Sequence, residues 1–216
     1  TDINYKVAGQ EDKETMFRTY SELLNSLDCA ATTKLTICNR RQSQADFEQS
    51  ILMPMREDRL DKYRREYNQM LMDKATGANG ITQEKYITIT VYKRDIEDAR
   101  AYFTRIGADL TARFAALGSK CVELDATDRL RILHDFYRAG DEGCFHFDMA
   151  DMARKGHDFK DYICPDGIEK HSDYLKLGDR YCRVLFLKDY ANYIQDEIVT
   201  NLTDLDRNMM LSIDIL

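Results

Sequence analysis

The stretch between residues 144 and 171 holds the densest group of side chains that could bind a metal. These side chains are Cys144, His146, Asp148, His157, Cys164 and His171. Zinc sites take four nitrogen or sulfur ligands, commonly as two close pairs. One close pair is present, but His157 and Cys164 stand too far apart to form the second. We therefore expect Phe145 and Phe147 to alternate into a core, with the polar residues facing out and no metal bound.

A cysteine–histidine nucleophilic pair is the other chemistry open to this stretch. Its partners would meet only in the folded chain, so the spacing neither predicts nor excludes it. No cysteine stands at a helix start or in a cluster of bases, the settings that lower a thiol pKa. A self-contained cytosolic enzyme using residues 144–171 is therefore the alternative hypothesis for this chain.

Two aspartate pairs have a spacing at which carboxylates could share acid–base work. They are Asp125 with Asp128, and Asp158 with Asp161. The chain holds 38 acidic residues, so close pairs are expected by chance. Asp125 and Asp128 also stand where a helix takes its N-terminal cap. We therefore predict structural roles for these aspartates.

Glycine spacing gives no nucleotide site. A phosphate-binding loop needs closely spaced glycines ahead of a helix, as in GxxxxGK[ST]. The ten glycines here are scattered, and the pattern is missing from the sequence. The sequence thus assigns no catalytic, cofactor-binding or metal-binding residue to this chain.

The charges argue against a nucleic-acid surface. Segment 56–74 carries Arg56, Arg59, Arg64 and Arg65, but acids are interleaved with them, which predicts a solvated helix laced by ion pairs. The net charge is −7, opposite to the basic surface that phosphate binding requires. Stacking of bases on the many tyrosines is a weaker alternative.

Hydrophobic periodicity predicts the elements that carry these residues. Strands are expected at 4–8, 32–38, 86–92, 121–124, 174–177, 181–187 and 211–215. Helices are expected at 11–27, 42–49, 56–74, 95–118, 127–138 and 194–202, the fifth capped by Thr127. A tight turn at Gly178 and Asp179 joins two strands into a hairpin.

The order of elements predicts an α+β fold. Residues 1–124 give β-α-β, a helical insertion and β-α-β, which is compatible with a ferredoxin-like sandwich. A hairpin, a helix and a strand then form a further unit. The expected parts are an N-terminal subdomain (1–140), a connecting segment (141–161) and the start of a second α+β unit (162–216).

Composition is that of a globular protein, with 44% hydrophobic and 32% charged residues. No apolar run approaches the roughly 20 residues of a membrane span. The first residues lack the basic start and apolar stretch of a signal peptide. The six cysteines contain no CxxC motif, which favours reduced cytosolic thiols.

The chain contains the stretches GHDFKDYICPDGIE, YLKLGDRYCRVLFLKDYANYIQDEIVTNLTDL and MMLSIDI, with INYKVAGQEDKETMFRTYSELLNSLD, EKYITITVYKRDIEDARAYF and ATDRLRILHDFYR upstream. These stretches resemble the traffic ATPases of conjugation and type IV secretion, in particular the TraE/TrsE-like group of integrative conjugative elements. Together they cover nearly the whole chain. Residues 141–151 match nothing in the family.

The resemblance implies the N-terminal part of a larger protein, cut off before its motor domain. That part would be a non-catalytic domain, located in the cytoplasm at the inner face of the membrane. Its partners would be inner-membrane components of the conjugation apparatus, its own motor domain and further copies in a dimer or hexamer. ATP and magnesium would bind only to the motor domain, and no family catalytic residue falls on this chain.

Overall fold

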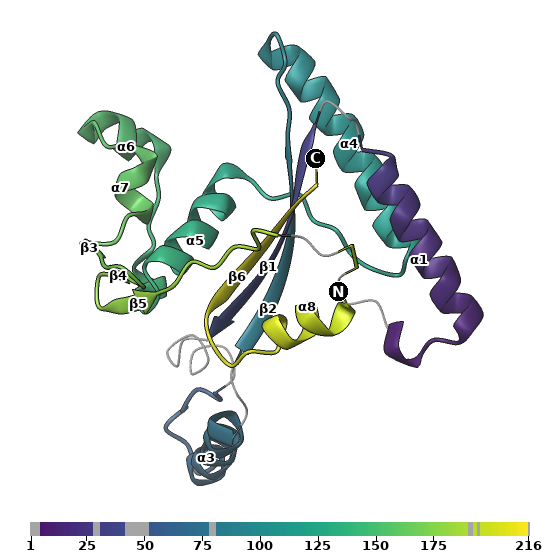
Figure 1. The fold of residues 1–216 in the computed structure, drawn as a ribbon. Coiled ribbons are helices and arrows are strands. Elements are labelled where there is room, and N and C mark those ends of the chain that lie inside the picture. The colour runs from purple at the N-terminus through teal and green to yellow at the C-terminus, as the bar shows by residue number, and fades with distance from the viewer. Residues whose placement is uncertain are drawn as a thin grey trace. The chain divides into compact units, whose positions relative to one another are not determined.

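The computed structural model describes residues 5–27, 31–41, 52–77, 81–189, 192–193 and 195–215. Within these ranges the chain is α+β, as predicted, with α-helices and two three-stranded antiparallel sheets (Figure 1). The helices are α1 (Gln10–Asn25), α3 (Asp61–Gly77), α4 (Ile96–Ala116), α5 (Ala126–Tyr137), α6 (Met149–Lys155), α7 (Phe159–Ile163) and α8 (Asp196–Thr203), with 3-10 turns η1 (Tyr5–Val7) and η2 (Glu142–Cys144). The strands are β1 (Thr32–Arg41), β2 (Ile81–Thr90), β3 (Ile168–Lys170), β4 (Leu175–Leu177), β5 (Arg180–Cys182) and β6 (Met209–Ile215). The helix expected at 42–49 lies outside the described residues.

The long strands form one sheet in the order β2-β1-β6, with β1 at its centre. Lys34 of β1 makes an ion pair with Asp214 of β6, with 3.3 Å between Nζ and Oδ1. The expected hairpin-helix-strand unit over 162–216 is therefore wrong in one respect. Its last strand pairs with the first strand of the chain, while the hairpin belongs to the separate sheet β3-β4-β5.

The chain divides into two compact units, and the three long strands contribute to both. The first unit comprises Thr1–Thr36, Lys85–Leu124 and Ser212–Leu216, and the second Ile37–Glu84 and Asp125–Leu211. These discontinuous units do not coincide with the contiguous parts expected from the sequence. The reason is that β1, β2 and β6 join residues that are far apart along the chain.

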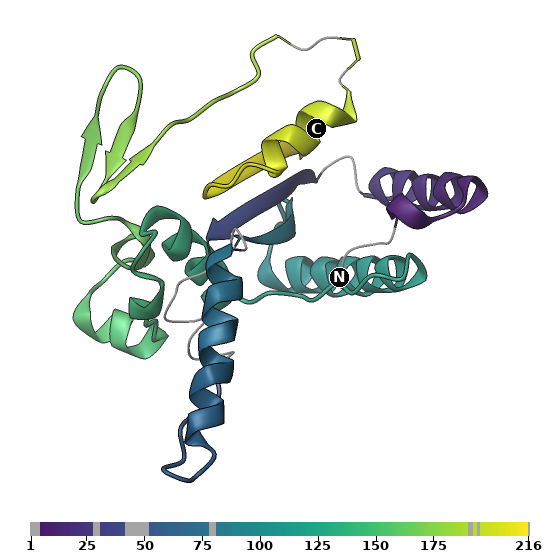
Figure 2. The same ribbon diagram turned by 90° about the horizontal axis from the view of Figure 1, so that it is seen from below.

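The core of the first unit lies where α1 and α4 pack against each other and against β2 (Figure 1, Figure 2). Leu23 of α1 is fully buried there, beside Tyr102, Ile106 and Leu110 of α4. Ile89 of β2 packs on this cluster from the sheet. The amphipathic helices predicted over 11–27 and 95–118 are therefore confirmed as the elements that build this core.

Two large aromatic residues at helical spacing in these helices lie outside this core. Phe17 of α1 is 68% exposed and Phe103 of α4 is 37% exposed. The buried residues are instead Leu23 and Tyr102. An apolar stripe on a helix is more than one residue wide, so spacing alone leaves the residues at its border undecided.

Two expected strands are not strands. Residues 5–7 form η1, and residues 121–124 have no regular structure. Val7 is 77% exposed and Val122 is 60% exposed, so neither segment has the buried face that stabilises a short strand in a sheet. The two β-α-β units expected in 1–124 are therefore incomplete at both of these points.

The second sheet contains the predicted hairpin, but its second strand, expected over 181–187, ends at Cys182. β4 pairs with β5 in the register Leu177 to Arg180, across a loop of Gly178 and Asp179. Gly178 has φ +56°, whereas Asp179 does not have a positive φ. A glycine at the first loop position is typical of a type II′ turn. β3 pairs with the other edge of β4.

Candidate functional site

Residues 144–148 alternate in exposure, as predicted. Phe145 and Phe147 are partly buried, while Cys144, His146 and Asp148 are exposed. The Phe145 ring lies 5.1 Å from the buried ring of His134, and the Phe147 ring lies 5.2 Å from that of Tyr162. The phenylalanines thus anchor this loop.

Two of the other candidate ligands, His157 and His171, each have their own neighbour. Nδ1 of His157 lies 3.2 Å from Oδ2 of Asp161, within one turn of the chain. The His171 ring stacks on Tyr174 at 4.4 Å. Cys164 is exposed at the end of α7. Among the residues that the structure describes, no three His, Cys, Asp or Glu side chains are grouped so that they could hold a metal.

The aspartate pairs are helix caps. The Asp125 carboxylate accepts a hydrogen bond from the Asp128 N–H, and the Asp128 carboxylate accepts one from the Asp125 N–H. Asp125, rather than Thr127, is therefore the N-cap of α5. At the start of α7, Asp161 accepts from the backbone N–H of Asp158, and this bond lowers the pKa of Asp161.

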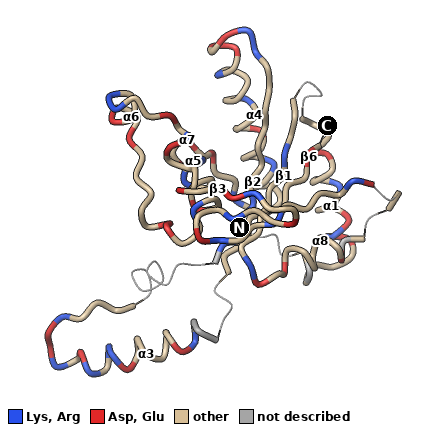
Figure 3. The backbone as a smooth tube through the Cα atoms, turned by 60° about the vertical axis from the view of Figure 1, so that its left-hand side comes forward, with Lys and Arg blue, Asp and Glu red and all other residues tan. Residues whose placement is uncertain are grey.

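The arginines of segment 56–74 are interleaved with acids (Figure 3). The helix expected over this whole segment begins only at Asp61, so Arg56 and Arg59 precede α3. Arg64 contacts both Asp58 and Asp61, at 2.5 Å in each case. The hydrogen bond from Arg64 lowers the pKa of Asp58. A backbone hydrogen bond from Arg56, with Arg64 second, lowers the pKa of Asp61. The ion pairs within this segment agree with the predicted solvated helix.

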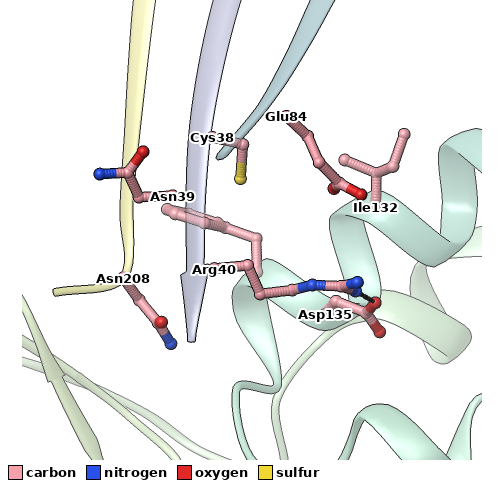
Figure 4. A pocket seen from close by; sticks show the side chains of 8 residues that line it. Cys38, Asn39, Arg40, Glu84, Ile132, Asp135 and Asn208 are labelled. Atoms are coloured by element: carbon pink, nitrogen blue, oxygen red, sulfur yellow. Dashed lines mark hydrogen bonds and ion pairs between the residues drawn. The ribbon is translucent and has the colours of Figure 1, made fainter. Parts of the chain in front are cut away.

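A buried ion pair joins β1 to α5, and no sequence pattern predicts it. Nη1 of Arg40 contacts Oδ2 of Asp135, a carboxylate that is 5% exposed (Figure 4). The other oxygen of Asp135 lies 3.2 Å from Nδ1 of His134, which is 4% exposed. A carboxylate removed from water needs such partners to remain charged. Arg40 and Asp135 are 95 residues apart, so only the fold could bring them together.

A small pocket in the second unit lies beside this pair (Figure 4). It is lined by Cys38, Asn39, Arg40, Glu84, Ile132, Asp135, Phe136 and Asn208. Burial, followed by the nearby charge of Glu84, raises the pKa of Cys38 to about 11. A thiol with that pKa stays protonated at neutral pH, and a protonated thiol is neither a nucleophile nor a metal ligand.

Polar side chains of β1 and β2 hold the C-terminus of α8. Nδ2 of Asn39 donates to the carbonyl oxygen of Thr203 at 2.6 Å and to that of Leu205 at 3.4 Å. Nε2 of Gln83 donates to Oδ1 of Asn39 at 3.1 Å. The last carbonyls of a helix lack partners within the helix, and Asn39 supplies one. Asn39 is 2% exposed, so these bonds are shielded from water.

Comparison of the chain with protein-family models, curated proteins and solved structures gave no match. The site must therefore be judged by its own chemistry. Arg40 and Asp135 are paired with each other, Asn39 donates to Thr203 and Leu205, and the raised pKa of Cys38 favours the protonated thiol. This arrangement can join β1, α5 and α8, but it offers no activated nucleophile. Separately, no helix in the described ranges combines the length and apolarity needed to cross a membrane.

Proposed function

We propose that this chain is a non-catalytic docking and assembly domain of a conjugative DNA-transfer ATPase. The observation that carries the proposal is an open apolar stripe, the α3 stripe, formed by Leu60 just before α3 and by Tyr63, Tyr67 and Met70 on the helix. Their exposed fractions are 56%, 65%, 44% and 42%. Contiguous exposed apolar groups of this kind typically mark a surface that binds another protein.

The opposite side of α3 is bonded to the segment that precedes the helix. Oδ1 of Asn68 accepts from the backbone N–H of Met53 at 2.9 Å, and Nδ2 of Asn68 donates to the Met53 carbonyl at 2.9 Å. Arg64 ties the helix to Asp58 in the preceding turn. A helix fixed on one side and apolar on another suits recognition by a groove on a partner.

In this proposal the partners are the motor domain of the same protein and inner-membrane components of the secretion apparatus. The domain works in the cytoplasm at the inner face of the membrane and positions the motor. ATP and magnesium bind to the motor domain. The resemblance supports this assignment, since the stretches that carry it span nearly the whole chain.

The proposal is tested by binding to purified partners. The partners are the motor domain and the membrane components encoded in the same transfer locus, each purified alone. We expect Tyr63→Asp with Tyr67→Asp to weaken binding by at least about tenfold, because aromatic anchors dominate interfaces. Tyr92→Asp is the matched control, since Tyr92 is 95% exposed and lies outside the α3 stripe. Unchanged affinity in the stripe variant would count against docking through α3.

Reading the source DNA beyond the codon for Leu216 tests the parent protein directly. We expect an open frame that soon encodes GxxxxGK[ST] after a β-rich run. A stop codon there, or ATP turnover by the clean chain, would overturn the proposal.

The alternative is a self-contained enzyme with a site in residues 144–171. The geometry of the described residues lends it no support, because His157 and His171 each face a separate neighbour and Cys164 is exposed. It predicts that Cys164→Ala or His146→Ala abolishes a turnover measured with the purified chain. A metal-free protein with ordinary thiol reactivity contradicts it.

A further inference from the structure

The segment that follows β5 leaves four consecutive apolar side chains in solvent. Val184, Leu185, Phe186 and Leu187 are 70%, 76%, 81% and 56% exposed. The chain runs on from the hairpin without forming a helix or a strand here, as Figure 2 shows. The backbone of residues 183–187 makes no hydrogen bond to the backbone of any other described residue. Such a segment is a template for pairing with another strand.

The hairpin fixes which backbone groups face the open side. In the described sheet β3-β4-β5, β5 is an edge strand. Leu177 and Arg180 close a two-residue loop, so their backbones bond to each other. In an antiparallel pair these bonds alternate along the strand. Arg180 and Cys182 therefore bond toward β4, and Tyr181 points its N–H and C=O to the open edge.

In the structure residues 183–188 form no strand and the chain bends at Asp189. When this segment is extended as a strand, the same alternation gives its open edge a defined set of residues. They are Arg183, Leu185, Leu187 and Asp189. The set begins with a base, ends with an acid and has two leucines between them. Read in the opposite direction, the same set begins with the acid and ends with the base. The edge is therefore complementary in charge to itself when two copies run antiparallel.

We propose that a second copy of this chain pairs antiparallel along this edge, with Phe186 of each copy on the two-fold axis. Arg183 then faces Asp189 of the second copy, and Leu185 faces Leu187, each twice by symmetry. A slip of one residue would place Arg183 against Lys188 and would mismatch the hydrogen-bonding groups. A slip of two residues would lose both Arg–Asp pairs.

The expected dimer is weak. Standard interfaces bury about 800 Å² on each partner, and weak encounters bury less. An interface formed by residues 183–189 of two copies falls in the class of weak encounters with small buried areas. We therefore expect association in the micromolar range rather than a permanent dimer. This inference is independent of the proposed function, since it uses neither the α3 stripe nor a motor domain.

Sedimentation equilibrium of the full chain tests the proposal. Between about 1 and 200 µM, a range chosen to bracket a micromolar Kd, the average mass should rise from 25.2 kDa toward twice that value. Arg183→Asp and Asp189→Arg should each weaken the dimer by at least about tenfold, because each puts like charges opposite one another. The double variant R183D/D189R should restore it. Asp173→Arg is the charge-matched control outside the pairing segment and should leave the dimer unchanged.

Hydrogen exchange supplies a second readout. Amide protons of Leu185 and Leu187 should exchange more slowly as concentration rises, while those of Val184 and Phe186 stay fast. A chain that remains monomeric at every concentration overturns the proposal, as does a double variant as weak as the single ones. Protection that does not depend on concentration also overturns it, and assigns the segment to a partner within the same chain.

Discussion

The Arg40 guanidinium contacts the Asp135 carboxylate, and this contact joins the central strand to α5. Asp135 is nearly inaccessible to water, whereas the Arg40 side chain is 32% exposed. The buried charge of Asp135 therefore depends on Arg40 for stabilisation more than the charge of Arg40 depends on Asp135. Removal of one partner from a buried pair leaves an uncompensated charge, which costs more than the pair contributes to stability.

We expect Arg40→Ala to lower the free energy of unfolding by about 3 kcal/mol, because it leaves Asp135 buried beside His134 alone. Lys34→Ala is the matched control, since the Lys34–Asp214 pair is 45% and 51% exposed. Exposed pairs contribute about 0–1 kcal/mol. Urea unfolding of both variants measures the difference, and equal midpoints would contradict the prediction.

Cys38 should make stability depend on alkaline pH. Its folded pKa of about 11 lies above the ordinary value of 9.0, so the folded state holds the thiol proton more tightly. This contribution is complete below pH 9 and is lost as pH rises to 11, a change of about 3 kcal/mol. Tyrosines and lysines also titrate in this range, so the measurement is the wild type compared with Cys38→Ala. Parallel stability curves for the two proteins would contradict it.

Asn39→Ala should release the C-terminus of α8. The variant loses the buried donor to Thr203 and Leu205, and we expect a cost of about 1–3 kcal/mol. Amide exchange in α8 should quicken more than in α1. Gln69→Ala is the control, because it removes an exposed bond to Asp73 within α3. Unaltered exchange in α8 would show that Asn39 does not hold it.

Gly178→Ala should destabilise the hairpin by about 1 kcal/mol, since a side chain at φ +56° clashes with the backbone. Gly143→Ala is the matched control. An added Cβ at either position meets no atom within 4 Å, and Gly143 does not have a positive φ. Chemical shifts of β4 and β5, with thermal unfolding, measure the effect. Equal losses at the two glycines would refute the conformational explanation.

Arg64→Gln should raise the pKa of Asp58 toward its ordinary value, because the Arg64 hydrogen bond is the main cause of its lowering. Asp61 should respond less, since its principal bond comes from the Arg56 backbone. Carboxyl titration by NMR gives both values. Because the pKa values of Asp58 and Asp61 are lower in the folded state, these acids stabilise the start of α3 at pH values above their ordinary pKa. This stabilisation is lost as the pH falls through the folded pKa. Arg65→Gln, the control, should move neither.

Local features were predictable from the sequence because their causes lie within a few residues. The roles of Asp125 and Asp128 and the alternation of Phe145 with its neighbours are confirmed. Pairings between distant elements were not predictable from the sequence. No spacing rule predicts that Arg40 pairs with Asp135, since neither residue differs in sequence context from other charged residues. The same holds for Asn39 at the end of α8.

The central position of β1 has a consequence for the order of events in the cell. Asn39 and its acceptor in Thr203 are separated by 164 residues, and β6 emerges from the ribosome later still. During synthesis β1 can pair with β2 early, but its other edge stays open for most of translation. Such late, long-range pairing slows folding and exposes nascent chains to aggregation. The growing chain would therefore gain most from chaperone protection while that edge waits for β6.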